Sequence, residues 1–322
     1  PTVYARQAKL ADAQVQQADA RKQVTHLQLN RDVKLAYEQL QHVRARQNLI
    51  LAQDSLYNQF ERAALIRERT GETGALERAT AQSKRLALQA ELTKAKADTR
   101  IAENRLRQLL QAPEGAVAFA QEVPKRYNSN WFSDTLHTSH VLRNLLESEV
   151  TVAERQARVE KARMMPDLSV GYFNQTFIGE SPKREPARVY DSGDRFTGFE
   201  AGIAVPLWFG AQRSRIKAAQ LNEEAVRSQV EAQERVLQTE LENAVQELNK
   251  QTNILQYYEQ GALQQAATLE KAASLSFRLG EIDYVEYVQA MEQAYLLRSE
   301  YLNSLLNYNQ SIINLEFLAG IE

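Results

Sequence analysis

The sequence contains no cysteine, which excludes disulfide bonds, cysteine zinc sites and thiol catalysis. Its 39 basic and 41 acidic residues nearly cancel, so we expect no general nucleic-acid-binding surface. No run of about 18 apolar residues occurs, and this excludes a membrane-spanning helix. Phosphate-cradling glycine loops, GxSxG and HExxH are also missing. We therefore expect a protein that is not an enzyme and that holds no cofactor and no metal.

Glycine and proline are scarce, at 12 and 7 residues. Together they make up about 6% of the chain, against roughly 12% in ordinary proteins. Ten of the nineteen lie in residues 166–210, whereas residues 2–70, 75–112, 211–260 and 281–319 contain none. Because glycine and proline end helices and make turns, this placement predicts long uninterrupted helices and one turn-rich segment.

The first segment without glycine or proline, residues 2–70, is long enough for a helix of about 65 residues, or roughly 100 Å. Such a length indicates a coiled coil or an elongated bundle, because helices of globular proteins average about 11–12 residues. Apolar residues in the last helix recur in steps of four and three, and this seam comprises Leu297, Tyr301, Leu305, Tyr308, Ile312 and Leu315. A second row comprises Leu302, Leu306 and Ile313, which predicts packing against more than one neighbour.

Two segments of the turn-rich part alternate between apolar and small or polar residues, which is the signature of β-strands. The second run has the length of a tilted strand across a bilayer, and its other face suits a water-filled lumen. We therefore predict lipid-facing strand residues. They are Leu168, Val170 and Tyr172 in the first segment, and Phe199, Ala201, Ile203 and Val205 in the second.

A soluble two-stranded hairpin would show the same alternation, because the signal of a single barrel strand is weak. A lone hairpin, however, is marginally stable in water. At the end of very long helices it would have no globular core to pack on. This argument favours barrel strands that other copies of the chain complete.

The two halves of the chain resemble each other at an offset of about 205–209 residues. The clearest match places RERTGETGALERATAQ at 67–82 on SFRLGEIDYVEYVQAMEQ at 276–293. Each repeat is a long helix, a glycine break and a returning helix. A short helix and the strand pair precede the second repeat, and nothing equivalent precedes the first. We therefore expect that the first-repeat strand hairpin is absent and that the chain is a fragment of a longer one.

The chain resembles the TolC family of outer-membrane efflux channels, the OEP family, over essentially its whole length. The most specific matches are RLGEIDYVEYVQAMEQAYLLRSEYLNSLLNYNQSIINLEFLAG at 278–320 and PDLSVGYF at 166–173. The resemblance implies a bacterial outer-membrane homotrimer, in which four strands per subunit form one barrel and long helices form a periplasmic tunnel. It also implies contacts with lipid, a periplasmic adaptor (membrane fusion) protein and an inner-membrane pump of the RND or another type. The tips and strands resemble the heavy-metal cation branch, of the CusC and CzcC type, slightly more than the drug branch.

The expected fold is mainly α, with two repeats of long antiparallel coiled-coil helical hairpins and a β-hairpin that contributes to a trimeric transmembrane β-barrel. The expected boundaries divide the chain into five segments. They are a first tunnel hairpin at 1–112, an equatorial linker at 113–138, a short helix at 139–165, the strand hairpin with an extracellular loop at 166–210, and a second tunnel hairpin at 211–322.

The helices reverse at two tips, RTGETGALE at 69–77 and RLGEIDYVE at 278–286, where glycine supplies the left-handed conformation that ends a helix. An ordinary helical turn would need the same residues. In the family the equivalent loops contact the adaptor. The resemblance therefore implies adaptor contacts at Arg69, Thr70, Gly71, Arg278, Leu279 and Gly280.

A candidate tunnel gate lies just beyond each tip, at Glu77 and at Glu286 in the equivalent position of the second repeat. In a trimer these residues would form rings of carboxylates, which favour cations. A solvated helix face is the alternative interpretation of either residue. The family often has a second acid one turn later, and here Gln289 takes that place and reduces the charge.

The function that these observations predict is the exit duct of a tripartite efflux pump, which exports heavy-metal cations or drugs without catalysis. A periplasmic adaptor is one alternative, but it would carry β-rich halves around a single helical hairpin. A soluble coiled-coil scaffold is the other, and it would make the strands dispensable for folding. Asp134, His137 and His140 are spaced to share a helix face as a metal site, although helix-start polarity explains them better.

Overall fold

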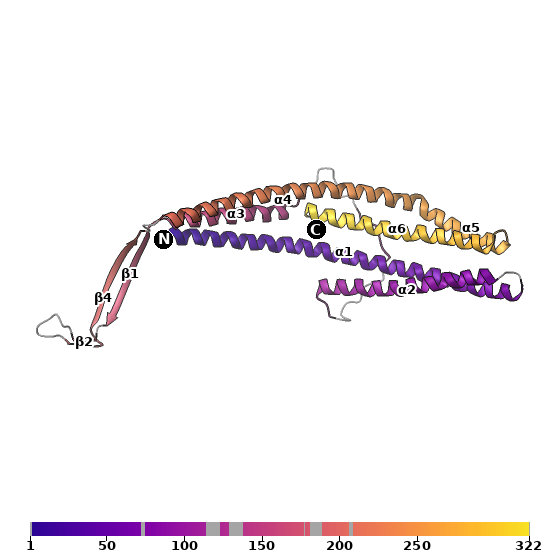
Figure 1. Cartoon of the computed structure of the whole chain (residues 1–322), viewed down its shortest axis with the longest axis horizontal. Coiled ribbons are helices and arrows are strands. Elements are labelled where there is room, and N and C mark those ends of the chain that lie inside the picture. Colours follow the sequence, from indigo (N-terminus) through magenta and orange to yellow (C-terminus); the bar gives the residue numbers. More distant parts are fainter. Residues whose placement is uncertain are drawn as a thin grey trace. The chain divides into compact units, whose positions relative to one another are not determined.

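The computed structural model describes residues 2–71, 75–113, 123–128, 138–176, 178–180, 189–205 and 209–321. Helices dominate it, as expected (Figure 1). The elements in chain order are α1 Thr2–Arg69, α2 Ala75–Leu110, α3 His140–Ala162, β1 Asp167–Thr176, β2 Gly179–Glu180, β3 Val189–Tyr190, β4 Arg195–Ala204, α4 Gly210–Tyr257, a π-helical turn at Tyr258–Ala262, α5 Leu263–Leu279 and α6 Tyr284–Ala319. None of the described helices has both the length and the apolar content that a bilayer crossing requires.

The chain forms two compact units, and α1 and α4 each contribute to both. Unit 1 comprises Pro1–Lys22 and Arg143–Glu234, and unit 2 comprises Gln23–Leu142 and Arg235–Glu322.

In unit 1, α3 packs through a stripe of small and apolar residues. The buried members are Leu146, Ala153, Ala157, Val159 and Ala162. Ion pairs join its outer face to both long helices: Glu154 pairs with Arg227 of α4 at 3.1 Å, and Glu149 with Arg21 of α1 at 3.9 Å. Strand β1 follows α3 in the chain, and strand β4 precedes α4. The two strands form an antiparallel hairpin.

In unit 2, α6 is the central helix, because it is buried on more than one side. Leu305, Tyr308, Ile312 and Leu315 of the expected seam are almost completely buried, and so is Ile313 of the second row. The seam packs against Leu241, Leu248 and Leu255 of α4. A separate cluster joins α1 to α2 through Leu40, Val43, Ala102 and Leu106.

The two repeats correspond closely. Helices α2 and α6 each have 36 residues and lie 209 positions apart at both ends. Buried Leu40 corresponds to buried Leu248, 208 positions later, whereas buried Ala64 corresponds to Ala273, 209 positions later. The π-helical turn at Tyr258–Ala262 lies between these two matches and accommodates the one additional residue of the second repeat.

Candidate functional site: the strand hairpin and the helical tips

Six of the seven predicted apolar strand residues lie on one face of the β1–β4 hairpin, and the seventh, Val205, follows the last residue of β4. The register places Leu168 opposite Ile203, Val170 opposite Ala201 and Tyr172 opposite Phe199. The rings of Tyr172 and Phe199 lie 5.4 Å apart. This face is open in the chain, since Val170 is 83% exposed and Phe199 82%.

The opposite face of the hairpin is built mainly from small and polar residues, with Phe173 and Phe196 as its two large apolar side chains. Gly198 lies opposite Phe173, and a Cβ at Gly198 would come within 2.7 Å of that ring. A Cβ at Gly202 would come equally close, 2.7 Å, to the hydroxyl of Ser169. These glycines therefore leave room for the side chains of the partner strand, and the two faces differ as the alternation predicts.

Each long strand has one unpaired edge among the described residues, because the sheet they form contains only β1 and β4. Their free N–H and C=O groups need partners in a medium without water. Both edges of the hairpin are thus available for pairing with further strands.

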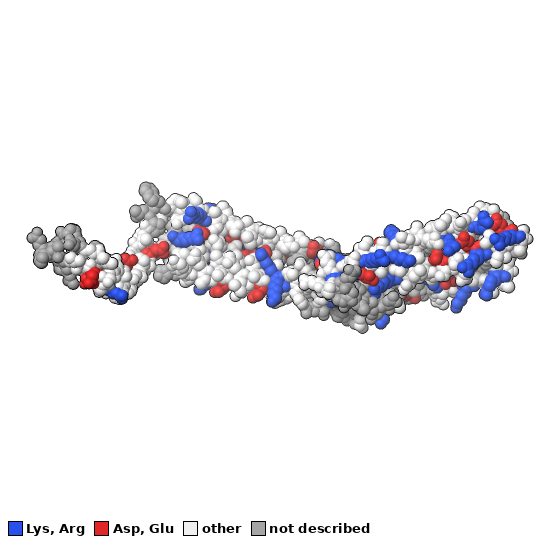
Figure 2. All heavy atoms as spheres, turned by 90° about the horizontal axis from the view of Figure 1, so that it is seen from below, with Lys and Arg blue, Asp and Glu red and all other residues white. Residues whose placement is uncertain are grey.

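Both tips reverse at a glycine, as predicted. Gly71 has φ of 77° and Gly280 has φ of 75°, in the left-handed region. Beyond Gly280, the Glu281 N–H donates to the Ser276 carbonyl at 2.9 Å and closes the end of α5. All six residues predicted to contact an adaptor are exposed: Arg69, Thr70, Gly71, Arg278, Leu279 and Gly280. Figure 2 shows Lys and Arg side chains crowded at this end of unit 2, with Asp and Glu between them.

The two candidate gate carboxylates have different surroundings. The Glu77 side chain is only 13% exposed and pairs with Arg67 at 3.2 Å. Glu286 is exposed, and with Asp283 it forms the capping box of α6: the Glu286 N–H donates to Asp283 Oδ1 at 2.8 Å and the Asp283 N–H donates to Glu286 Oε2 at 3.1 Å. Gln289 is also exposed. The sequence analysis missed the capping box, although the Asp-x-x-Glu spacing signals it.

An aromatic cluster near the tips joins the two helical hairpins, and the sequence analysis did not identify it. The rings of Phe60 and Tyr287 lie 4.7 Å apart, and Phe277 stacks on Tyr287 at 4.8 Å. Burial raises the pKa of the neighbouring Tyr284 to about 12, with smaller contributions from Glu77 and Glu292. A Lys84–Glu292 ion pair links the same hairpins. The two helical hairpins of the chain are therefore packed against each other near their tips.

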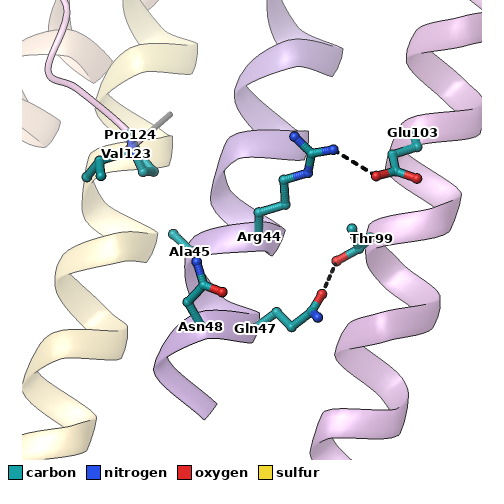
Figure 3. A pocket seen from close by; sticks show the side chains of 8 residues that line it. All are labelled: Arg44, Ala45, Gln47, Asn48, Thr99, Glu103, Val123 and Pro124. Carbon is teal, nitrogen blue, oxygen red and sulfur yellow. Dashed lines mark hydrogen bonds and ion pairs between the residues drawn. The ribbon is translucent and has the colours of Figure 1, made fainter. Parts of the chain in front are cut away.

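Helices α1 and α2 leave a pocket of about 470 Å³ beside Val123 and Pro124 (Figure 3). Arg44 pairs with Glu103 at 2.8 Å, and the Thr99 hydroxyl donates to Gln47 Oε1 at 2.9 Å. These polar groups satisfy one another, so the pocket offers no unmatched charge to a ligand.

The described residues contain no group of three side chains that could hold a metal ion. Two residues of the alternative metal site considered from the sequence, Asp134 and His137, lie outside the described residues. The third residue, His140, is the first residue of α3.

Comparison with solved structures identifies the fold. The chain matches the CmeC outer membrane channel of Campylobacter jejuni with a TM-score of 0.85 and 14% identity, over 99% of this chain and 68% of that one. It matches VceC of Vibrio cholerae with a TM-score of 0.80 and 18% identity, over 99% and 77%. CusC matches with a TM-score of 0.80 and 16% identity, over 98% and 74%.

No curated protein matches the sequence significantly. The model of the family described as outer membrane efflux protein matches residues 131–321, which is more than half of the chain. The region contains the strand hairpin and the whole second repeat, where the expected motifs lie. The chain therefore belongs to the outer membrane efflux protein family.

Proposed function

We propose that three copies of this protein assemble into the exit duct of a tripartite efflux pump. The protein is an outer-membrane efflux channel rather than an enzyme, and its long helices lie on the periplasmic side. The observation that carries the proposal is the β1–β4 hairpin, which has one exposed apolar face and two unpaired edges. Strands from sister subunits supply the missing hydrogen bonds, and closure into a barrel removes every free edge.

The apolar face of the hairpin contacts lipid in this assembly, and the face with Ser169 and the glycines lines water. The alternation of the two faces is regular from Asp167 to Tyr172 and from Phe199 to Ala204, whereas Phe173 and Phe196 lie on the face of Ser169 and the glycines.

The tips dock a periplasmic adaptor that connects the duct to an inner-membrane pump. Both tips expose a short loop with a basic residue and a left-handed glycine: Arg69 and Gly71 in one, Arg278 and Gly280 in the other. Their exposed basic side chains offer positive charge to a partner. The adaptor is thus expected to approach both repeats in a similar way.

Three exposed Glu286 carboxylates would give the narrow end of the tunnel a preference for cations. This arrangement is compatible with export of heavy-metal cations or of cationic drugs. The likeness to CusC and to CmeC concerns the fold alone and does not distinguish the two kinds of cargo, so the charge of the gate is the argument that concerns the cargo.

The decisive experiment compares two arginine substitutions at adjacent positions of β1. Val170→Arg places a charge on the proposed lipid face and costs roughly 2–4 kcal/mol near the middle of a bilayer. Ser169→Arg places the same charge at the same depth on the proposed lumen face. We expect the wild type and Ser169→Arg to insert as trimers and conduct ions in planar bilayers, and Val170→Arg to fail. Equal insertion of both variants, or a monomeric wild type without conductance, would refute the proposal.

A further inference from the structure

A second hollow, of about 410 Å³, lies in unit 1 between the beginning of α1 and the end of α3. Four basic side chains line it, Arg6 and Lys9 from α1 and Arg158 and Lys161 from α3, and none of the described residues that line it has a carboxylate. Ligand pockets commonly enclose about 300–1,000 Å³, so the size suits a small polar group. We call this hollow the junction pocket.

The positive charge of the junction pocket is poorly compensated. Arg6, Lys9 and Lys161 form no ion pair with any other described residue. Arg158 approaches Glu154 at 3.6 Å, but Glu154 also pairs with Arg227 at 3.1 Å. The acid nearest in sequence to Lys161, Glu160, pairs with Arg163 at 2.9 Å.

The spacing of the basic residues concentrates this charge. Arg6 and Lys9 are three residues apart on α1, and Arg158 and Lys161 are three residues apart on α3. Residues at this spacing are neighbours on a helix surface, and like charges there repel each other. An anion bound between the two helices would relieve the repulsion on both.

The position of the junction pocket indicates the source of the anion. Met165 lines the pocket and lies two residues before β1 begins at Asp167. If the hairpin crosses the bilayer, as proposed above, the pocket lies at the depth of the periplasmic headgroups, and the inference rests on that proposal. Met165 and Leu168 are 54% and 57% exposed and provide apolar surface beside the basic residues.

We propose that the junction pocket binds the phosphate of an anionic phospholipid headgroup such as phosphatidylglycerol. Guanidinium groups hold phosphate oxygens by paired N–H donors, and ammonium groups add point charges. A zwitterionic headgroup has a phosphate too, but its own cation competes with the four basic side chains. The pocket therefore prefers a headgroup with net negative charge.

The test uses the purified protein in a neutral detergent, titrated with phosphatidylglycerol or with phosphatidylcholine of the same acyl chains. Binding is followed by native mass spectrometry. We expect a lower Kd for phosphatidylglycerol, and the double variant Arg158→Gln/Lys161→Gln should raise that Kd about tenfold or more. Arg6→Gln/Lys9→Gln removes the two positive charges on the opposite wall of the pocket and should also raise the Kd. Salt at about 1 M should abolish the preference.

The matched control is Lys94→Gln/Lys96→Gln, which removes two exposed lysines from α2 in unit 2 and should leave the Kd within about twofold. Helical circular dichroism confirms that each variant is folded. Equal Kd values for the two lipids, or no effect of both pocket variants, would overturn the proposal. Binding of sn-glycerol 3-phosphate as strong as that of the lipid would overturn the lipid as its source. None of these measurements needs a conducting channel, so failure of the exit-duct proposal is recognised separately by its own conductance assay.

Discussion

Glu77 and Glu286 occupy equivalent positions of the two repeats, yet Arg67 neutralises Glu77 at 3.2 Å whereas Glu286 stays exposed at the start of α6. The two carboxylates therefore differ in what they can offer to a passing ion. The Glu77 side chain is only 13% exposed and its charge is paired, so it offers little charge to an ion in the tunnel. The second repeat, rather than both, is expected to carry the charge of the gate.

The first prediction follows from this asymmetry. Glu286→Gln should weaken the block of single-channel currents by multivalent cations, because it removes a ring of three free charges. Glutamine is also accepted at this position of a capping box, so stability should change little. Glu77→Gln is the matched control and should alter the block much less. An unchanged block in Glu286→Gln would exclude this residue from the gate.

The second prediction concerns the left-handed glycine of the second tip. Gly280→Ala should cost about 1–2 kcal/mol, because φ is 75° and an added Cβ meets no atom within 4 Å, so the conformation alone is penalised. Gly261→Ala, which also has open space, is the control and should not destabilise the protein. Thermal unfolding measures both, and an equal loss in the two variants would contradict the prediction.

The third prediction concerns pH. His42 is only 8% exposed, its Nδ1–H donates to the Leu302 carbonyl at 3.3 Å, and burial lowers its pKa below 6.5. The unfolded chain therefore takes up this proton first as pH falls. The free energy of unfolding should decrease below pH 6.5, by at most about 1.4 kcal/mol per pH unit. This contribution should be fully present above that pH.

The variant that tests it is His42→Asn, whose amide can keep the bond to the carbonyl but does not titrate. Urea unfolding between pH 7.5 and 5.5 should show a smaller pH dependence than in the wild type. Identical slopes in the wild type and in His42→Asn would contradict the assignment.

The fourth prediction concerns the fully buried Asn309. Its amide nitrogen donates to Glu38 Oε2 at 2.7 Å and to the Lys125 carbonyl at 2.8 Å, and its oxygen accepts the Tyr127 N–H at 3.0 Å. Asn309→Ala removes a partner from the buried Glu38 carboxylate, from the N–H of half-buried Tyr127 and from the Lys125 carbonyl, and should cost about 3 kcal/mol. Asn303→Ala, at a half-buried position of the same helix, should cost less than about 1 kcal/mol. Urea unfolding midpoints of Asn309→Ala and Asn303→Ala that agree within error would contradict this prediction.

The elements that the sequence predicted are those that depend on local pattern. Alternation in the strands fixed which residues share a face, and the observed pairing of Val170 with Ala201 follows from it. Glycine at the tips was recognised because few other residues adopt positive φ. The repeat was visible because the same pattern recurs at a nearly constant spacing.

Other features could not be predicted because they depend on contacts between distant segments. Arg67 is separated from Glu77 by the tip, so only the folded hairpin shows that the pair forms. The stack of Phe277 on Tyr287 and the role of Asn309 likewise need the tertiary structure. The lipid, adaptor and gate contacts stay predictions, since they belong to the assembled channel.

The π-helical turn has a consequence for how the two modules diverged. One extra residue in the middle of a long packed helix would normally rotate every later side chain by about 100° about the helix axis. Many of the core-facing side chains would then point away from the core. The wide turn at Tyr258–Ala262 absorbs that rotation, so the segments on either side keep the same inward faces as their counterparts in α1. The two repeats can thus differ by one residue at this turn and still bury equivalent faces before and after it.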